Sequence, residues 1–337
     1  MRLIARYLEV MIGRCWRAIF RNKERAASAS LPWVDRQRVA HLFHLDEGIP
    51  QVDWGAADLW VNQQEPDFSR HGALRRAVAA AWLDEVRDSL ETDHRRWRTA
   101  LIEGLAPLEE GLGERIARTG AHAAELIART LRPLRGEAPI EPFGLIALKS
   151  YKDYISFEAH GMPEEGTFAT SGGSYVHGGA DAFPVVVLPV NVPHSIEATI
   201  AHEVTHHALH SMELPLWLEE GFTQMMEERV TGHTRFVLNQ EQVERHRALW
   251  SEVGLDTFFS GDGFFSPEGA AQELSYHLSQ AIVRGMLSHY PEAFFRFARA
   301  ARCGDNGEGA AREHLGRDLE DLALALIGPL DDVADGL

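Results

Sequence analysis

Residues 201–210 read Ala201-His202-Glu203-Val204-Thr205-His206-His207-Ala208-Leu209-His210. We expect this segment to be helical, and side chains four positions apart lie on one face of a helix. His202 and His206 can therefore present imidazole nitrogens to a single metal ion. Glu203 lies one residue further round the helix, where its carboxylate can reach a water that the metal activates without becoming a ligand itself.

A zinc ion that performs chemistry needs a third protein ligand and one open coordination position. Beyond a turn at residues 212–215, a second predicted helix begins with Leu216-Trp217-Leu218-Glu219-Glu220-Gly221-Phe222. Glu220 follows His206 with thirteen residues between them, and two helices joined by a short connection can place it at the metal. The sequence therefore predicts a Zn²⁺ site formed by His202, His206 and Glu220.

Neighbouring residues leave alternatives open. His206 and His210 are also four apart, although a metal on that pair would leave Glu203 a full turn from its expected place. His207 is expected on the helix face or outside the ligand set. Glu219 is expected to be solvated or near the cleft rather than to bind the metal.

The two motifs resemble those of the gluzincin metallopeptidases, the group of thermolysin and aminopeptidase N. The shared pattern is His-Glu-x-x-His followed by Trp-Leu-x-Glu-Gly-Phe, and it is most similar to the short peptidase MA-like domains of bacteria. The resemblance extends over roughly residues 140–330 and includes a strand-to-helix opening, LIALKSYKDYISF. It implies a zincin-like fold, Zn²⁺ as cofactor, and the glutamate directly before the glycine, Glu220, as the third ligand.

The resemblance also implies roles for two residues outside the ligand set. In that family, a tyrosine at the place of Tyr276 donates a hydrogen bond to the tetrahedral intermediate; His277 is the second choice here. Glu227 lies seven residues after Glu220 on the same helix face. It resembles an acidic position that supports a zinc-binding histidine from outside. Independently of the family, Arg284 lies eight residues past Tyr276 and is a candidate to face the same site.

The sequence departs from the family in three respects. Aminopeptidases hold the substrate's amino terminus with a Gly-x-Met-Glu-Asn segment, which the predicted strand FPVVVLPV at 183–190 lacks; this argues against an exopeptidase. Gln224 stands where thermolysin-like enzymes have an aspartate beside a zinc histidine, so the outer partner of that histidine is left open. Residues 1–135 match no family pattern.

The composition is that of an ordinary globular chain. Of 337 residues, 45% are hydrophobic and 25% charged, and 33 basic against 50 acidic residues give a net charge of −17. Nucleic-acid binding needs a basic face, so this balance argues against it. The two cysteines, Cys15 and Cys303, are far apart in sequence, which fits a reducing compartment and argues against a disulfide-stapled secreted fold.

The first 25 residues differ from the rest in charge. They carry seven basic and two acidic groups, a charge of +5 that leaves −22 for residues 26–337. Apolar residues recur every three or four positions, which predicts a basic amphipathic helix. Its charges argue against a secretory signal and a bilayer span. Two interpretations stay open: a terminal helix packed against protein, or a helix lying on a membrane surface.

The rest of the chain divides at a linker rich in proline and glycine near 132–139. Residues 26–138 are predicted to form a mostly helical N-terminal region, with helical runs that include about 93–109 and 112–131. Residues 139–337 are predicted to form the zincin-like peptidase domain, with strands at 143–149 and 183–190 and helices from about 195 onward. Pro184 and Pro189 favour a sheet edge for the second strand, because proline cannot donate to a ladder.

We therefore expect an α+β protein that acts as a zinc metallopeptidase on a protein or peptide substrate, with Glu203 as general base. An extended substrate pairing with the 183–190 strand would favour an endopeptidase. We expect a cytoplasmic enzyme, with peripheral contact at the inner membrane surface through residues 1–25 as one option. The alternative is a non-catalytic, partner-binding regulatory protein that uses the zincin fold as a scaffold; intact Glu203 argues against it. The sequence carries no signal for the oligomeric state, cleavage specificity or activation.

Overall fold

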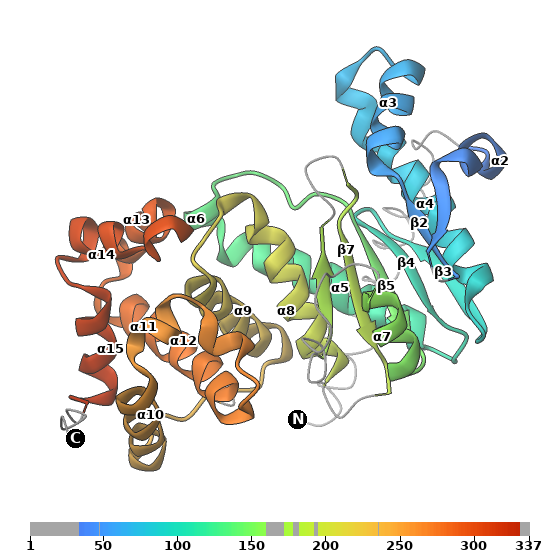
Figure 1. Cartoon of the computed structure of the whole chain (residues 1–337). Coiled ribbons are helices and arrows are strands. Elements are labelled where there is room, and N and C mark those ends of the chain that lie inside the picture. Colours follow the sequence, from blue (N-terminus) through green and yellow to red (C-terminus); the bar gives the residue numbers. More distant parts are fainter. Residues whose placement is uncertain are drawn as a thin grey trace, which may run out of the picture. The chain divides into compact units, whose positions relative to one another are not determined.

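A computed structural model of the chain describes residues 34–46, 48–159, 172–177, 182–191, 195–234 and 236–330. The chain forms an α+β structure with two units, one of residues up to 121 with 141–193, the other of residues 122–140 with 194–337 (Figure 1). The helix predicted at residues 1–25 lies outside the described residues. Among the described helices, none combines the length and apolar character that a bilayer span requires.

The first unit is built on a five-stranded sheet in the order β3-β4-β5-β7-β6. Its three central strands run parallel, and each outer strand is antiparallel to its neighbour. The central strands are buried along their whole length, which suits their apolar sequences. The strands are β3 (His94–Arg98), β4 (Ile102–Pro107), β5 (Phe143–Leu148), β6 (Ser174–Val176) and β7 (Val185–Pro189).

Strand β7 lies inside the sheet, so the prediction of a sheet edge at 183–190, with a substrate paired along it, is wrong. It pairs in parallel with β5 on one side and antiparallel with β6 on the other. Pro184 precedes the strand, and its carbonyl accepts a hydrogen bond from the Gly144 amide; Pro189 is the last residue of the strand. Prolines at the two ends remove no donor from the middle of the ladder, so they do not require an edge.

Helices and a hairpin complete the first unit. Trp82 and Leu83 pack in one core cluster with Tyr154 and the strand residues Leu105 and Ile146. The elements are α2 (Arg36–Val39), η1 (Ala40–Leu42), the hairpin of β1 (Phe43–Asp46) and β2 (Ile49–Val52), α3 (Trp54–Gln64), η2 (Phe68–Arg70), α4 (His71–Ser89), the first part of α5 (Leu112–Thr130) and α7 (Tyr151–Ala159).

Two sequence expectations differ from this arrangement. The helix predicted over 93–109 is wrong, because these residues form β3 and β4. The sheet also joins strands from both sides of the predicted boundary at 138–139, since β4 pairs with β5. The compact units therefore divide the chain differently from the predicted N-terminal region and peptidase domain.

The second unit consists, in its described part, of helices. Trp217 lies at its core, with ring centroids 5.6 Å from Phe259 and 6.2 Å from Phe297. After the end of α5, the elements are α6 (Arg132–Arg135), α8 (Ile196–Leu209), η3 (His210–Met212), α9 (Leu216–Thr231), α10 (Gln240–Val253), α11 (Leu255–Phe259), η4 (Asp262–Phe265), α12 (Gly269–His289), α13 (Pro291–Ala300), η5 (Cys303–Asp305), α14 (Glu308–Leu315) and α15 (Leu319–Ile327).

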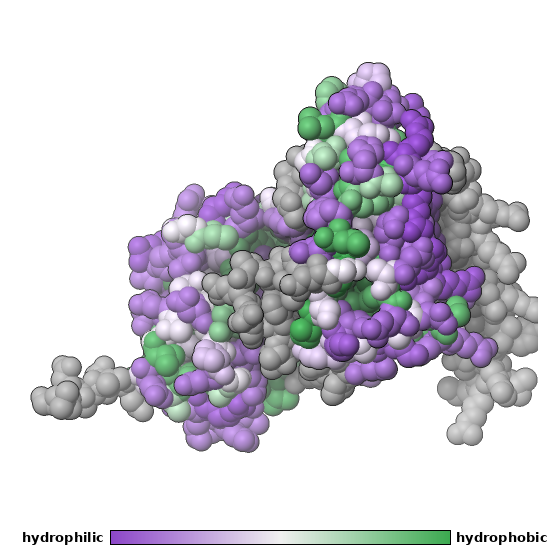
Figure 2. Space-filling view, turned by 45° about the vertical axis from the view of Figure 1, so that its right-hand side comes forward, coloured by the Kyte–Doolittle hydropathy of each residue, from purple (hydrophilic) through white to green (hydrophobic). Residues whose placement is uncertain are grey.

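Most of the described surface in Figure 2 is hydrophilic, and hydrophobic residues occur there in small groups. The exposed large hydrophobic side chains come from separate elements: Leu45, Leu59, Phe68, Leu108, Val237, Val253 and Phe265. Apolar residues scattered in this way are ordinary for a protein surface.

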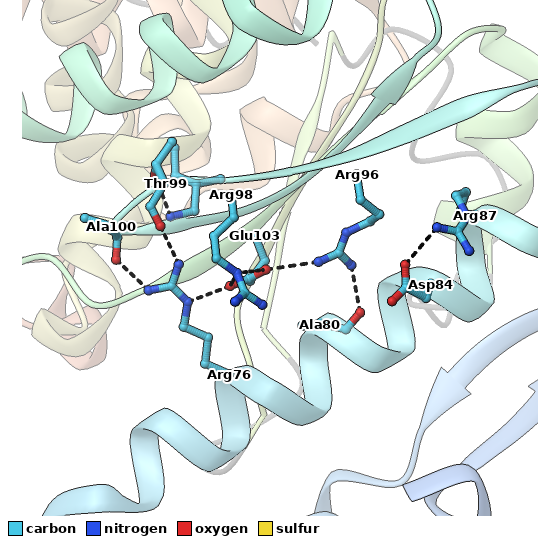
Figure 3. Close-up of polar contacts among 10 residues, drawn as sticks. Arg76, Ala80, Asp84, Arg87, Arg96, Arg98, Thr99, Ala100 and Glu103 are labelled. Carbon is cyan, nitrogen blue, oxygen red and sulfur yellow. Dashed lines mark hydrogen bonds and ion pairs between the residues drawn. The ribbon is translucent and has the colours of Figure 1, made fainter. Parts of the chain in front are cut away.

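A buried ion cluster joins α4 to strands β3 and β4 (Figure 3). Glu103 is fully buried, and its carboxylate accepts hydrogen bonds from three guanidinium groups, those of Arg76 at 2.8 Å, Arg96 at 3.0 Å and Arg98 at 3.0 Å. Arg76 and Arg96 also donate to backbone carbonyls. The cluster therefore ties the helix to the β3–β4 hairpin.

Candidate metal centre

Helices α8 and α9 bring the three predicted ligands together within the second unit. Candidate ligand atoms of His202, His206 and Glu220 all lie within 4.8 Å of one another. The two imidazole Nε2 atoms are 3.1 Å apart. Oε2 of Glu220 lies 3.4 Å from Nε2 of His202, and Oε1 of Glu220 lies 3.5 Å from Nε2 of His206. Two imidazole nitrogens and both oxygens of one carboxylate, from two helices, thus face one small volume.

These three distances fit a zinc ion. Zinc bonds of about 2.0–2.2 Å to nitrogen and oxygen at tetrahedral angles put neighbouring ligand atoms about 3.3 Å apart. The observed separations of 3.1, 3.4 and 3.5 Å lie close to that value. Two imidazoles and a carboxylate are also a donor set that catalytic zinc sites use.

Local sequence explains how the two helices are placed. Ser195 caps α8, with its hydroxyl accepting a hydrogen bond from the Ala198 amide at 3.4 Å. Gly221, next to the third ligand, lies against α12: an added Cβ would come within 2.4 Å of Val283 Cγ2 and 2.7 Å of the Ser279 carbonyl oxygen. A glycine at this position therefore lets α12 approach α9 closely beside Glu220.

A carboxylate outside the cluster holds each histidine. Nδ1 of His202 donates to Glu227, and Nδ1 of His206 donates to Glu219, each at 2.7 Å. Because a carboxylate only accepts hydrogen bonds, these contacts put the proton on Nδ1 and direct the Nε2 lone pair at the cluster. Glu227 thus lies where its predicted role requires.

The structure gives Glu219 and Gln224 contacts that the sequence left open. Glu219 was expected to be solvated or near the cleft, but its side chain is only 20% exposed and orients His206. Gln224 donates to Glu227 at 3.1 Å, so it supports the outer partner of His202. The need of each zinc-binding imidazole for an outer acceptor is the signal that could have found Glu219.

The charges of the site favour a cation. Burial disfavours a charged imidazole, but Glu220 and Glu227 outweigh it and raise the pKa of His202 to about 10. Burial opposes charge on His206 as well, and there Glu220 and Glu219 raise the pKa. A proton on one Nε2 would link that nitrogen to a single acceptor, whereas a metal ion would bind both imidazoles and the carboxylate.

Glu203 has the environment of a general base. It is 6% exposed, and its carboxylate accepts no hydrogen bond from the described part of the chain. Burial raises its pKa above the usual range of a glutamate, and the neighbouring imidazoles oppose that rise. A carboxylate with free lone pairs and a raised pKa is suited to take up a proton.

Tyr276 on α12 lies beside the cluster, with its ring centroid 6.4 Å from that of His202. Its hydroxyl makes no hydrogen bond to a described residue. The charge of Glu220 and burial raise its pKa, which keeps the hydroxyl protonated and able to donate.

The second choice, His277, is engaged elsewhere. It shares a hydrogen bond of 2.8 Å with His246 through Nδ1 and donates from Nε2 to the Val237 carbonyl at 3.1 Å. Arg284 forms an ion pair with Glu228. The alternative ligand His210 lies in η3 and is exposed.

Comparison with known proteins gives no relative for this chain: no protein-family model matches the sequence, and no curated protein matches it.

Proposed function

We propose that this protein is a zinc metallopeptidase that hydrolyses internal peptide bonds of a protein or peptide substrate. The observation that carries the proposal is the set of three side chains whose facing nitrogen and oxygen atoms lie 3.1–3.5 Å apart, with both imidazoles oriented by outer carboxylates. His202, His206 and Glu220 would hold the zinc. Bound there, zinc would supply Lewis-acid chemistry, polarising the substrate carbonyl and acidifying water.

The remaining chemistry falls to two side chains. Glu203 takes a proton from the attacking water as the water oxygen bonds to the carbonyl carbon, and it delivers that proton to the leaving amine as the carbon–nitrogen bond breaks. The Tyr276 hydroxyl donates a hydrogen bond to the carbonyl oxygen as negative charge develops on it. Glu219 and Glu227 keep the imidazoles in the required tautomer.

One sequence feature supports an internal cleavage site. The strand FPVVVLPV lacks the Gly-x-Met-Glu-Asn segment with which aminopeptidases hold a free amino terminus. The proposal keeps the expectation of a cytoplasmic enzyme.

The test compares purified wild type with Glu203→Gln on a peptide library, with cleavage sites identified by mass spectrometry. Wild type should cleave, and Glu203→Gln should keep its zinc while losing about 10²- to 10⁴-fold in rate. Glu252→Gln makes the same chemical change at an exposed position of α10 and should retain full activity. Undiminished cleavage by Glu203→Gln would contradict the proposal, as would a wild type that holds zinc and cleaves nothing.

A further inference from the structure

A pocket of about 480 Å³ lies in the second unit beside the candidate metal centre. Helix α9, helix α12 and the segment between α9 and α10 line it, and its lining includes Glu227 and Tyr276. Both residues also belong to the candidate centre, since Glu227 bonds to His202 and the Tyr276 ring lies 6.4 Å from the His202 ring. The volume is within the range of small-ligand sites.

Three carboxylates line the pocket, but two of them are neutralised by arginines. Glu273 accepts two hydrogen bonds from Arg245, at 2.9 and 3.1 Å. Glu228 pairs with Arg284 and accepts the Phe236 amide at 3.0 Å. Each of these two carboxylates is therefore paired with an arginine. Among the three, Glu227 has no arginine partner in the described residues.

That third carboxylate, Glu227, has one oxygen to offer. Both of its side-chain hydrogen bonds, from His202 and Gln224, reach Oε1. Oε2 accepts no hydrogen bond from the residues that the structure describes. A negatively charged acceptor therefore remains available at the wall of the pocket nearest the candidate metal ligands.

Two amides add acceptors on the same lining. Gln280 is 6% exposed and donates through Nε2 to the Gln224 carbonyl at 3.5 Å, which turns its Oε1 away from that carbonyl. Its Oε1 has no partner among the described residues, and Gln280 lines the pocket. Gln224 donates through Nε2 to Glu227, and its Oε1 is likewise unbonded within the described chain.

Phe236 and His277 also line the pocket. A chain of hydrogen bonds holds His277 in place. Trp250 donates to Nδ1 of His246 at 3.1 Å, which leaves Nε2 of His246 to donate to His277, and His277 to donate to the Val237 carbonyl. Tryptophan only donates and a carbonyl only accepts, so this order determines both tautomers. Phe236 stacks on the His277 ring at 4.9 Å. The pocket thus combines apolar faces with unpaired acceptors.

We propose that this pocket binds the lysine or arginine side chain of a substrate residue next to the cleaved bond. The inference rests on the proposed peptidase function and names its substrate class. The aliphatic stem would lie against Phe236 and Tyr276, and the cationic end would donate to Glu227 Oε2 and to the amide oxygens of Gln280 and Gln224. A norleucine side chain fills similar space but would leave those acceptors unpaired, and a glutamate would be repelled.

The test measures kcat/KM on fluorogenic peptides that differ only at one residue flanking the cleaved bond: lysine, arginine, norleucine or glutamate. Lysine and arginine should exceed norleucine by about tenfold or more, since hydrogen bonds to a charged group are worth that much. Gln280→Leu removes one of the three acceptors and should lower the lysine-to-norleucine ratio, and Gln280→Glu should raise it. Glu252→Gln, which changes a charge outside the pocket, should leave the ratio unchanged.

A binding measurement separates this inference from the peptidase proposal. Full-length Glu203→Gln protein is titrated with N-acetyl-lysine amide and N-acetyl-norleucine amide and followed by NMR. Selective binding of the lysine amide, weakened in the Gln280→Leu background and strengthened in the Gln280→Glu background, supports the pocket even if no peptide is cleaved. Equal binding of the two amides overturns it. Cleavage without a basic preference also overturns the pocket while leaving the peptidase proposal in place.

Discussion

The two units each bury a polar cluster, and the clusters are opposite in character. In the first unit, the fully buried Glu103 is surrounded by three guanidinium groups that donate to both of its oxygens (Figure 3). In the second unit, two imidazole nitrogens and the Glu220 carboxylate face one another at 3.1–3.5 Å. The first cluster has donors in excess, and the second has acceptors in excess.

The difference shows what separates a structural cluster from a candidate site. Burial of charge is common to both, so burial alone does not indicate function. Glu103 already has its hydrogen-bond donors within the protein, and the cluster is complete as a link between α4 and the sheet. We propose that a cation from outside the chain satisfies the facing lone pairs of the second cluster.

The largest effect is expected at Glu103. Glu103→Gln removes the negative charge that three buried or half-buried arginines share and should lower the free energy of unfolding by about 3–5 kcal/mol. Glu203→Gln should change it far less, because that carboxylate accepts no hydrogen bond from the described residues. Denaturant unfolding of both variants in a chelator measures the contrast; equal losses would show that the two clusters do not differ as argued.

The next effect concerns the carboxylates that orient the imidazoles. Glu219→Gln and Glu227→Gln should each weaken zinc binding about 10- to 100-fold, or about 1.4–2.7 kcal/mol, because the outer hydrogen bond sets the tautomer and basicity of a ligating histidine. Competition with a chromophoric zinc chelator gives the affinities, with Glu252→Gln as the control. An unchanged affinity for Glu219→Gln would remove its role beside His206.

A smaller, pH-dependent effect is expected at His246, a buried polar group that is hydrogen-bonded without charge. Burial, together with the neighbouring His277 and Arg245, lowers its pKa to about 3. The unfolded chain, with a histidine pKa near 6.5, then binds more protons than the folded chain between these values, so stability falls as pH drops below about 6.5. The slope due to His246 is at most about 1.4 kcal/mol per pH unit.

The measurement compares unfolding free energies of wild type and His246→Gln between pH 7.5 and 4.5. The variant should be less stable at pH 7.5 and should lose less stability on acidification. Parallel curves for the two proteins would show that His246 takes up its proton as easily in the folded state as in the unfolded state.

The candidate site could be predicted from the sequence because its geometry is local. His202 and His206 lie one helical turn apart, and Glu220 comes from the next helix along the chain, so spacing alone brings them together. Glu219 was missed because its partner is specified by the rotation of α9 relative to α8, which spacing does not determine.

The sheet was harder to predict for the opposite reason. The segment over 93–109 contains residues that favour helices as well as strands, and its identity as β3 and β4 depends on pairing with β5 some forty residues later. The position of β7 depends likewise on the short β6, whose pairing places two prolines at strand ends rather than at a sheet edge. Such long-range pairing leaves no periodic signal in a single segment.

We propose that the second cluster holds one zinc ion. The zinc content of the purified full-length protein, measured by mass spectrometry, tests this directly. We expect one Zn²⁺ per chain in wild type and in Glu203→Gln. Folded Glu220→Ala should lose it, while folded Glu252→Gln should keep it. Zinc binding at this cluster would be contradicted by a folded wild type that holds no stoichiometric zinc after equilibration with the ion. A Glu220→Ala variant that holds as much zinc as wild type would contradict it equally.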